Sequence, residues 1–214
     1  MKYYFLLIHT IKNESLFLKA AAFSFNSKAT LFLGRGSSGK TVFLSGMCLN
    51  GAKFISNSHA IVKNDEVYGI ASAMRIRPQP WCEGFFNKSK IHPGIRQGEI
   101  IVDPFDMFKQ DSQPSIQVAN ICILNFEGSH IHRIKKISHK VALSYAEQFS
   151  LGINVYRLEE YLLDLFKDDL NLFSEKYVLM KKRLKNLIEN CTCYYMSTDI
   201  LNKKNRDEVI SLLS

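Results

Sequence analysis

The fold is decided by the stretch Leu31-Phe32-Leu33-Gly34-Arg35-Gly36-Ser37-Ser38-Gly39-Lys40-Thr41. Its first three residues predict a short buried strand, and they run directly into a G-x-x-x-x-G-K-[ST] loop. After the loop, apolar residues recur at helical spacing from Val42 onward. A strand, this loop and a helix in that order predict an α/β nucleotide-binding domain of the P-loop type.

Each residue type in the loop has a physical reason for its place. Glycines let the backbone fold tightly around a polyphosphate with several N–H groups pointing inward, and the following helix adds its positive N-terminal end. We expect Lys40 to reach the β- and γ-phosphates of ATP or GTP, and the Thr41 hydroxyl to coordinate Mg²⁺. The residues predicted to bind the nucleotide are Gly34, Arg35, Gly36, Ser37, Ser38, Gly39, Lys40, Thr41 and Val42.

Length and composition are those of an ordinary globular domain. The chain has 214 residues, of which 46% are hydrophobic and 22% charged, and we expect a single domain over residues 1–214. The apolar start of the chain lacks a small-residue cleavage site after it. No apolar run approaches the roughly 20 residues of a membrane span. We therefore expect a cytoplasmic protein that does not act in a membrane.

The formal net charge of +8 raises the question of nucleic-acid binding. The basic residues are spread through the chain, and the densest clusters, at residues 133–136 and 181–185, are typical of solvated faces. We therefore expect no nucleic-acid partner. The five cysteines are an odd, scattered set, and the Cys191/Cys193 pair fits core packing better than a zinc site.

The pattern of the first half predicts mostly strands. We expect strands at residues 3–11, 16–22, 53–56 and 118–126, and a hairpin between residues 60–62 and 67–70. Residues 75–98 are rich in proline, glycine and aromatic residues and predict a substrate-facing loop. The second half predicts a helix-rich segment at about residues 138–190, a strand at 193–196 and a helix at 206–213.

Beyond the loop, a longer succession of motifs resembles the kinase domain of the HPr kinase/phosphorylase family. The matching segments are Leu33-Gly-Arg-Gly-Ser-Ser-Gly-Lys-Thr, Asn50-Gly-Ala-Lys-Phe-Ile-Ser, Met74-Arg-Ile-Arg-Pro, Ile101-Val-Asp-Pro-Phe-Asp and Tyr194-Tyr-Met-Ser. The resemblance implies a central mixed β-sheet with a helical C-terminal part, a fold shared with phosphoenolpyruvate carboxykinase. It also implies phosphoryl transfer to a peptide or small-protein hydroxyl, as in the small kinases of this group that modify ribosomal-peptide precursors, and a possible homo-oligomer.

The chain departs from that family where catalysis would be centred. Family members carry an Asp-Asp pair after the strand that follows the loop helix, whereas this chain has Asn57-Ser58. The resemblance assigns general acid/base and Mg²⁺ roles to those aspartates. Asn57 retains an oxygen that can contact a metal or its water, but neither side chain accepts a proton near neutral pH.

Two other residues are candidates for the proton acceptor. His59 follows the pair directly, its ordinary pKa lies near neutrality, and strand alternation places it on the same side as Asn57. A solvent-facing histidine at a strand end is the commoner case. Asp103 is the second candidate, although aspartate before proline is commonly a turn former. Arg75 and Arg77 alternate on an extended segment, so both can face phosphates or solvent.

These patterns support three hypotheses about function. The first is an ATP- or GTP-dependent kinase acting on a peptide or small protein. The second is a nucleotide-binding regulatory or accessory protein that has lost transfer activity, which the loss of the Asp-Asp pair favours. The third is a small-molecule kinase whose acceptor pocket contains Trp81, Phe85 and Phe86.

Overall fold

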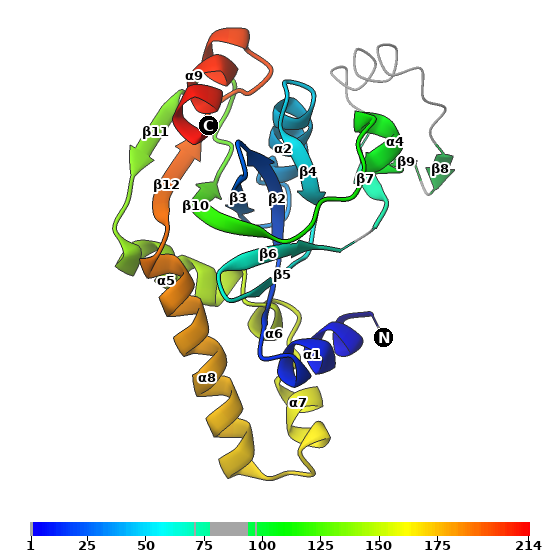
Figure 1. The fold of residues 1–214 in the computed structure, drawn as a ribbon, viewed down its shortest axis with the longest axis vertical. Helices are drawn as coiled ribbons and strands as arrows, with labels where there is room; N and C mark the ends of the chain where they lie inside the picture. The colour runs from blue at the N-terminus through cyan, green and yellow to red at the C-terminus, as the bar shows by residue number, and fades with distance from the viewer. Residues whose placement is uncertain (1, 71, 78–93, 97) are drawn as a thin grey trace.

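The computed structural model describes residues 2–70, 72–77, 94–96 and 98–214. Within them, nine strands form one mixed sheet in which β1, β5, β6, β10, β3, β2 and β4 are successive neighbours and β12 and β11 continue from β10 (Figure 1). These strands are β1 (Leu16–Leu18), β2 (Ala20–Phe25), β3 (Lys28–Leu33), β4 (Lys53–Ser56), β5 (Ala60–Lys63), β6 (Glu66–Gly69), β10 (Ile116–Leu124), β11 (Arg133–Lys136) and β12 (Thr192–Ser197). A second sheet has the order β7 (Met74–Ile76), β9 (Glu99–Val102), β8 (Gly94–Arg96).

Helices cover both faces of the large sheet, and each face has its own hydrophobic core. One core is packed by α1 (Lys2–Lys12), α5 (His139–Phe149), α6 (Gly152–Val155), α7 (Glu159–Leu165) and α8 (Leu170–Glu189). The other is packed by α2 (Lys40–Cys48), α4 (Pro104–Phe108) and α9 (Lys203–Leu213). Strand alternation explains the division: Leu31 and Leu33 enter the first core, whereas Phe32 between them enters the second.

The centre of the sheet determines where the site lies. Strand β10 pairs in parallel with β3 on one side and with β12 on the other. In open α/β sheets, ligands bind beyond the carboxyl ends of the parallel strands. The loop that leaves β3 at Leu33 and enters α2 at Lys40 therefore emerges at the edge where a ligand site is expected.

Most of the predicted elements are present. The strand–loop–helix unit, the strand over residues 53–56 and the hairpin of β5 and β6 are confirmed. The same holds for the strand predicted over residues 118–126, the helix-rich segment around residues 138–190, and the closing strand and helix. Cys191 and Cys193 are buried in the same core, as predicted for packing residues. Most of the predicted loop at residues 75–98 lies outside the described residues.

The strand predicted over residues 3–11 is wrong, because this segment forms helix α1. Leu7 and Thr10 are buried on one face while Phe5 and His9 are exposed on the other, which is the spacing of a helix with one buried face. The segment predicted over residues 16–22 is also divided. Strands β1 and β2 are separated at Lys19, whose backbone N–H donates to the Ser150 carbonyl at 2.7 Å instead of to a neighbouring strand.

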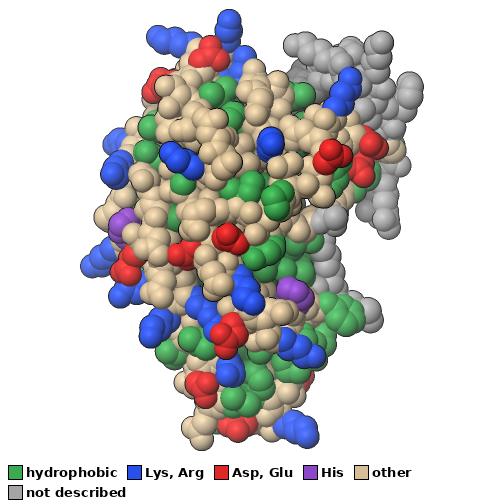
Figure 2. Space-filling model, in the orientation of Figure 1, with side chains coloured by type: hydrophobic (Ala, Val, Ile, Leu, Met, Phe, Trp, Pro, Cys, Tyr) green, Lys and Arg blue, Asp and Glu red, His purple; other side chains and the backbone are tan. Residues whose placement is uncertain are grey.

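The basic clusters lie at the surface, as the sequence predicts. Arg133, Lys135 and Lys136 are exposed on β11, an edge strand of the sheet that was not predicted from the sequence. In Figure 2, Lys and Arg side chains are spread over the visible face among acidic ones. None of the described helices is both long enough and apolar enough to cross a membrane.

Substituting Gly152 by alanine is expected to destabilise the fold by about 1–3 kcal/mol. A Cβ on Gly152 would lie 2.4 Å from Cδ1 of the buried Phe17 ring, which is rigid and stacked against Tyr156. Urea unfolding monitored by circular dichroism measures the change in the free energy of unfolding. Gly36→Ala is the matched control, because no atom lies within 4 Å of the Cβ it adds. Equal stability of the two variants would contradict the packing argument.

Candidate functional site

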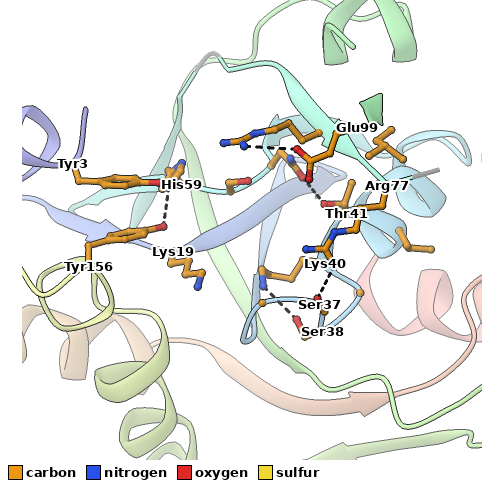
Figure 3. Close-up of a pocket in the computed structure, with 17 residues that line it drawn as sticks. Tyr3, Lys19, Ser37, Ser38, Lys40, Thr41, His59, Arg77, Glu99 and Tyr156 are labelled. Atoms are coloured by element: carbon orange, nitrogen blue, oxygen red, sulfur yellow. Dashed lines mark hydrogen bonds and ion pairs between the residues drawn. The ribbon is translucent and has the colours of Figure 1, made fainter. Parts of the chain in front are cut away.

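A cavity of about 580 Å³ lies beyond the carboxyl end of β3 (Figure 3). Its lining comes from segments that are far apart in the sequence, including the loop, the end of β4, helix α1 and strands β7 and β9. The described residues that line it are Tyr3, Lys19, Gly36, Ser37, Ser38, Gly39, Lys40, Thr41, Val42, Asn57, Ser58, His59, Arg75, Ile76, Arg77, Glu99 and Tyr156. Seven of the nine predicted nucleotide-binding residues, 36–42, therefore share one cavity wall.

The backbone of the loop requires glycine at two of its positions. Gly39 has φ of 91° directly before helix α2, a conformation that strains any residue with a Cβ. A Cβ on Gly34 would lie 2.3 Å from Oγ of Ser38 and 2.8 Å from the carbonyl oxygen of Leu124 at the end of β10. Gly34 thus lets the loop pack tightly against the parallel strands, while Gly36 and Gly39 line the cavity.

Lys40 folds back over the loop that precedes it. Its Nζ donates to the carbonyl oxygens of Gly34 at 2.6 Å and Arg35 at 2.8 Å, and to Oγ of Ser38 at 3.2 Å. Gly34 and Arg35 do not line the cavity, so their part in the site is to hold this ammonium through their carbonyls. Burial, followed by the nearby positive charge of Lys19, lowers the pKa of Lys40 to about 8.

The two residues predicted to contact a metal are brought together. The Thr41 hydroxyl donates to Oδ1 of Asn57 at 3.2 Å, and Asn57 is buried at the end of β4. Both offer neutral oxygen ligands of the kind Mg²⁺ accepts alongside nucleotide phosphates. Among the described residues, no group of three or more His, Cys, Asp or Glu side chains is arranged to hold a metal ion.

His59 lies in the cavity wall and is only 8% exposed, so it is not the solvent-facing histidine that the sequence left as an alternative. Its Nε2 shares a hydrogen bond of 2.8 Å with the Tyr156 hydroxyl. Tyr3 stacks on Tyr156 with 3.9 Å between the ring centroids, and Phe17 packs against both rings and the imidazole. Burial, together with Tyr3, raises the pKa of Tyr156, so this phenol stays neutral and fixes the orientation of His59.

Strands β7 and β9 of the small sheet contribute charged residues to the cavity lining. Nη1 of Arg77 donates to Oγ of Ser37 in the loop at 3.1 Å. Arg75 forms an ion pair of 3.7 Å with Glu99, but its side chain is 72% exposed, so this pair is weak. Arg75 and Arg77, which from the sequence could face either phosphates or solvent, both line the cavity. Glu99 is the one carboxylate among the described lining residues.

Asp103, the second predicted proton acceptor, is not among the described residues that line the cavity. Its carboxylate instead accepts a hydrogen bond from the backbone N–H of Phe105 at 2.8 Å and caps helix α4. Aspartate at the position before a proline that opens a helix satisfies a backbone donor with no helical partner. The structure thus supports the alternative, local role of Asp103.

Four residues of the cavity lining were not predicted from the sequence: Lys19, Tyr3, Tyr156 and Glu99. Lys19 carried a signal, because it is the one charged residue between Leu16 and Phe25, and lysine is rarely placed among buried strand residues without a reason. No sequence pattern indicated Tyr3 or Tyr156, because the stacking of their rings depends on how α1 and α6 pack on the sheet.

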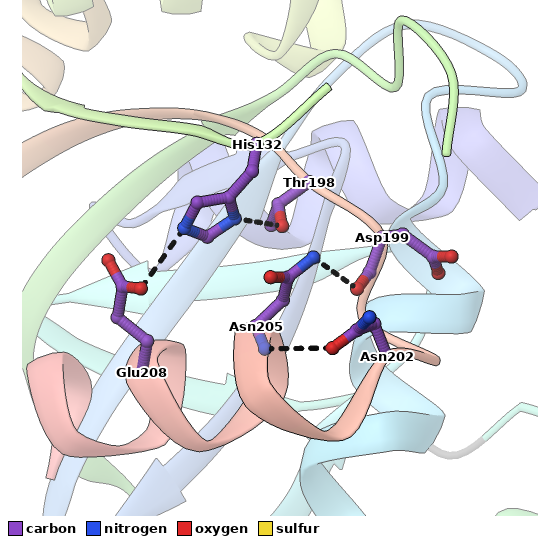
Figure 4. Close-up of polar contacts among 6 residues, drawn as sticks. All are labelled: His132, Thr198, Asp199, Asn202, Asn205 and Glu208. Atoms are coloured by element: carbon purple, nitrogen blue, oxygen red, sulfur yellow. Dashed lines mark hydrogen bonds and ion pairs between the residues drawn. The ribbon is translucent and has the colours of Figure 1, made fainter. Parts of the chain in front are cut away.

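A second polar cluster lies between β11 and α9 (Figure 4). His132 Nδ1 lies 2.7 Å from Oγ1 of Thr198, and its Nε2 lies 3.0 Å from Oε2 of Glu208. A hydroxyl, an imidazole and a carboxylate in a row resemble the groups of a nucleophilic triad. Thr198 is fully buried, however, so no substrate reaches its hydroxyl. Through His132, the cluster links Glu208 of α9 to Thr198 at the end of β12.

Comparison with models of known protein families finds no family that matches this chain, and comparison with curated proteins finds no significant relative. A function for this chain therefore has to be inferred from the chemistry of the cavity.

Proposed function

We propose that the protein binds ATP or GTP with Mg²⁺ in this cavity and transfers the γ-phosphoryl group to a hydroxyl of a peptide or small protein. In this proposal it is a cytoplasmic kinase of the HPr kinase-like, P-loop type. The observation that carries the proposal is the placement of the 36–42 loop segment and His59 on the walls of the same cavity.

The charge of the cavity supports a polyphosphate ligand. Its described lining contains four cationic side chains, Lys19, Lys40, Arg75 and Arg77, and one carboxylate, Glu99. Cations concentrated in a partly buried cavity attract a multiply charged anion more strongly than the same charges in water. The backbone N–H groups at the start of α2 add to this attraction.

The His59 side of the cavity is suited to an acceptor hydroxyl. His59 is held in place by its hydrogen bond to Tyr156, and a positioned histidine is the commonest proton acceptor in enzymes. Phosphoryl transfer otherwise needs little from the protein beyond positioning and electrostatic stabilisation. In the proposed reaction, the acceptor hydroxyl lies between His59 and the nucleotide.

A nucleotide-binding regulatory protein without transfer activity is the second candidate. The observation that favours it is the absence of a carboxylate at Asn57-Ser58, beside the Thr41 hydroxyl. Glu99, the remaining carboxylate of the described lining, is paired with Arg75. In this candidate, nucleotide occupancy would be read by a partner instead of driving chemistry.

Two measurements separate these candidates. Calorimetric titration with ATP and GTP in the presence of Mg²⁺ tests binding, and incubation with γ-labelled nucleotide and peptide or protein acceptors tests transfer. Binding with transfer is the expected result. Binding without transfer to any acceptor would favour the regulatory candidate, and no binding of either nucleotide would overturn both.

The affinity for ATP is expected to fall by about tenfold between pH 7 and pH 9. The phosphates bind the ammonium form of Lys40, and its pKa of about 8 in the free protein means that this form is lost as the pH rises through 8. Lys40→Arg is the matched control, because a guanidinium stays charged throughout this range. Calorimetry at both pH values measures the change. A wild-type affinity as constant as that of Lys40→Arg would contradict the prediction.

A further inference from the structure

Lys19 projects into the cavity from a rigid position. It lies between Leu18 and Ala20, which are 1% and 0% exposed, and its backbone N–H is held by the Ser150 carbonyl at 2.7 Å. Its Nζ lies 6.0 Å from the centroid of the Tyr156 ring. The sheet and the aromatic wall therefore determine where this ammonium can reach.

The side chains of Lys19 and Lys40 both line this part of the cavity. The charge of Lys19 is one of the two causes that lower the pKa of Lys40. None of the carboxylates in the described part of the chain forms an ion pair with Lys19. Like charges held close together in a half-buried site repel each other, and a bound anion would relieve that repulsion.

The contacts also give the order of groups along the cavity. Lys40 lies on the loop, Lys19 is its neighbour, Lys19 contacts the Tyr156 ring, and Tyr156 bonds to His59. In Figure 3, Lys19 accordingly lies between Lys40 and the His59–Tyr156 pair. In the proposed reaction, the phosphoryl group that is transferred must lie between the loop and His59. The side chain of Lys19 lies in this same part of the cavity.

We propose that Lys19 and Lys40 together hold the terminal phosphate of the bound nucleoside triphosphate, and that Lys19 gives the cavity its preference for triphosphate over diphosphate. This inference rests on the proposed function. Lys40 contacts the phosphate from the side of the loop, whereas Lys19 contacts it from the side of the acceptor. A diphosphate lacks the group that Lys19 binds.

The test is the ratio of two affinities, measured by calorimetry with Mg²⁺, for ADP and for an ATP analogue with a non-hydrolysable imido bridge. In Lys19→Met, the affinity for the triphosphate is expected to fall about tenfold while that for ADP changes less than about twofold, since one charge-assisted contact to the terminal phosphate is lost. Lys19→Arg should keep the wild-type preference. Lys53→Met, which removes an exposed lysine outside the described cavity lining, should change neither affinity.

A second readout does not use diphosphate. Without Lys19, the pKa of Lys40 should rise, so the loss of triphosphate affinity with increasing pH should begin at a higher pH in Lys19→Met than in the wild type. Equal losses of triphosphate and ADP affinity, or no loss of either, would overturn the inference while leaving the proposed function intact. A wild-type protein that binds neither nucleotide would overturn both.

Discussion

Replacing Lys40 by methionine is expected to weaken the binding of ATP by at least about tenfold, or 1.4 kcal/mol. Methionine keeps most of the aliphatic chain but removes the ammonium, which is held toward the loop by Gly34, Arg35 and Ser38. A charge-assisted contact in a partly buried phosphate site is worth more than the same contact at the surface. Calorimetric titration of both proteins with Mg²⁺ and ATP measures the loss.

Lys53→Met controls for the loss of one positive charge from the protein as a whole. Lys53 is exposed at the start of β4 and is not among the described residues that line the cavity, so its removal should leave the affinity unchanged. Because Lys40 also satisfies carbonyls of the loop, urea unfolding of the variant distinguishes a lost contact from a lost fold. A folded Lys40→Met protein with wild-type affinity would contradict the assignment of the loop as a phosphate site.

The strand, loop and helix over residues 31–48 were predictable because their signals are local. The strand, the glycines that the backbone requires and the helix that begins at Lys40 are consecutive in the sequence, so one motif describes them all. The two-residue period of β2 and β3, which divides the two cores, is equally local. Helix α1 shows where such reasoning fails, since an unbroken apolar run fits both a strand and a helix until packing buries one face.

The rest of the site is non-local and was less predictable. Lys19 and Lys40 line the same cavity because β2 pairs with β3. Tyr156 forms a hydrogen bond with His59 because α6 packs against β1. Glu99 enters the cavity from β9, which pairs with β7 and is separate from the large sheet. Asp103 is the converse case, because a local rule, aspartate before a proline that opens a helix, accounts for its contact in the structure.

If the protein is a kinase, His59→Ala is expected to reduce the rate of phosphoryl transfer by about 10²–10⁴-fold, the usual loss when a general base is removed. Nucleotide affinity should change little, because His59 contacts Tyr156 on the wall away from the loop. Single-turnover transfer from γ-labelled ATP measures the rate, and calorimetry measures the affinity. Tyr156→Phe, which keeps the ring stacked on Tyr3 but removes the hydroxyl, should cause a smaller loss because it only frees the imidazole to turn.

Two further variants test whether a carboxylate acts instead. Glu99→Gln removes the remaining carboxylate of the described lining, and the double variant Asn57→Asp/Ser58→Asp restores acids beside the Thr41 hydroxyl. If His59 accepts the proton, Glu99→Gln should keep transfer within about tenfold of the wild type, because the exposed pair with Arg75 contributes little. A loss in Glu99→Gln larger than that in His59→Ala would assign the proton to the carboxylate. A protein that hydrolyses nucleotide only after the acids are restored would instead be a binding protein whose catalytic groups have been lost, since the cavity then holds the phosphates without a group to accept the proton.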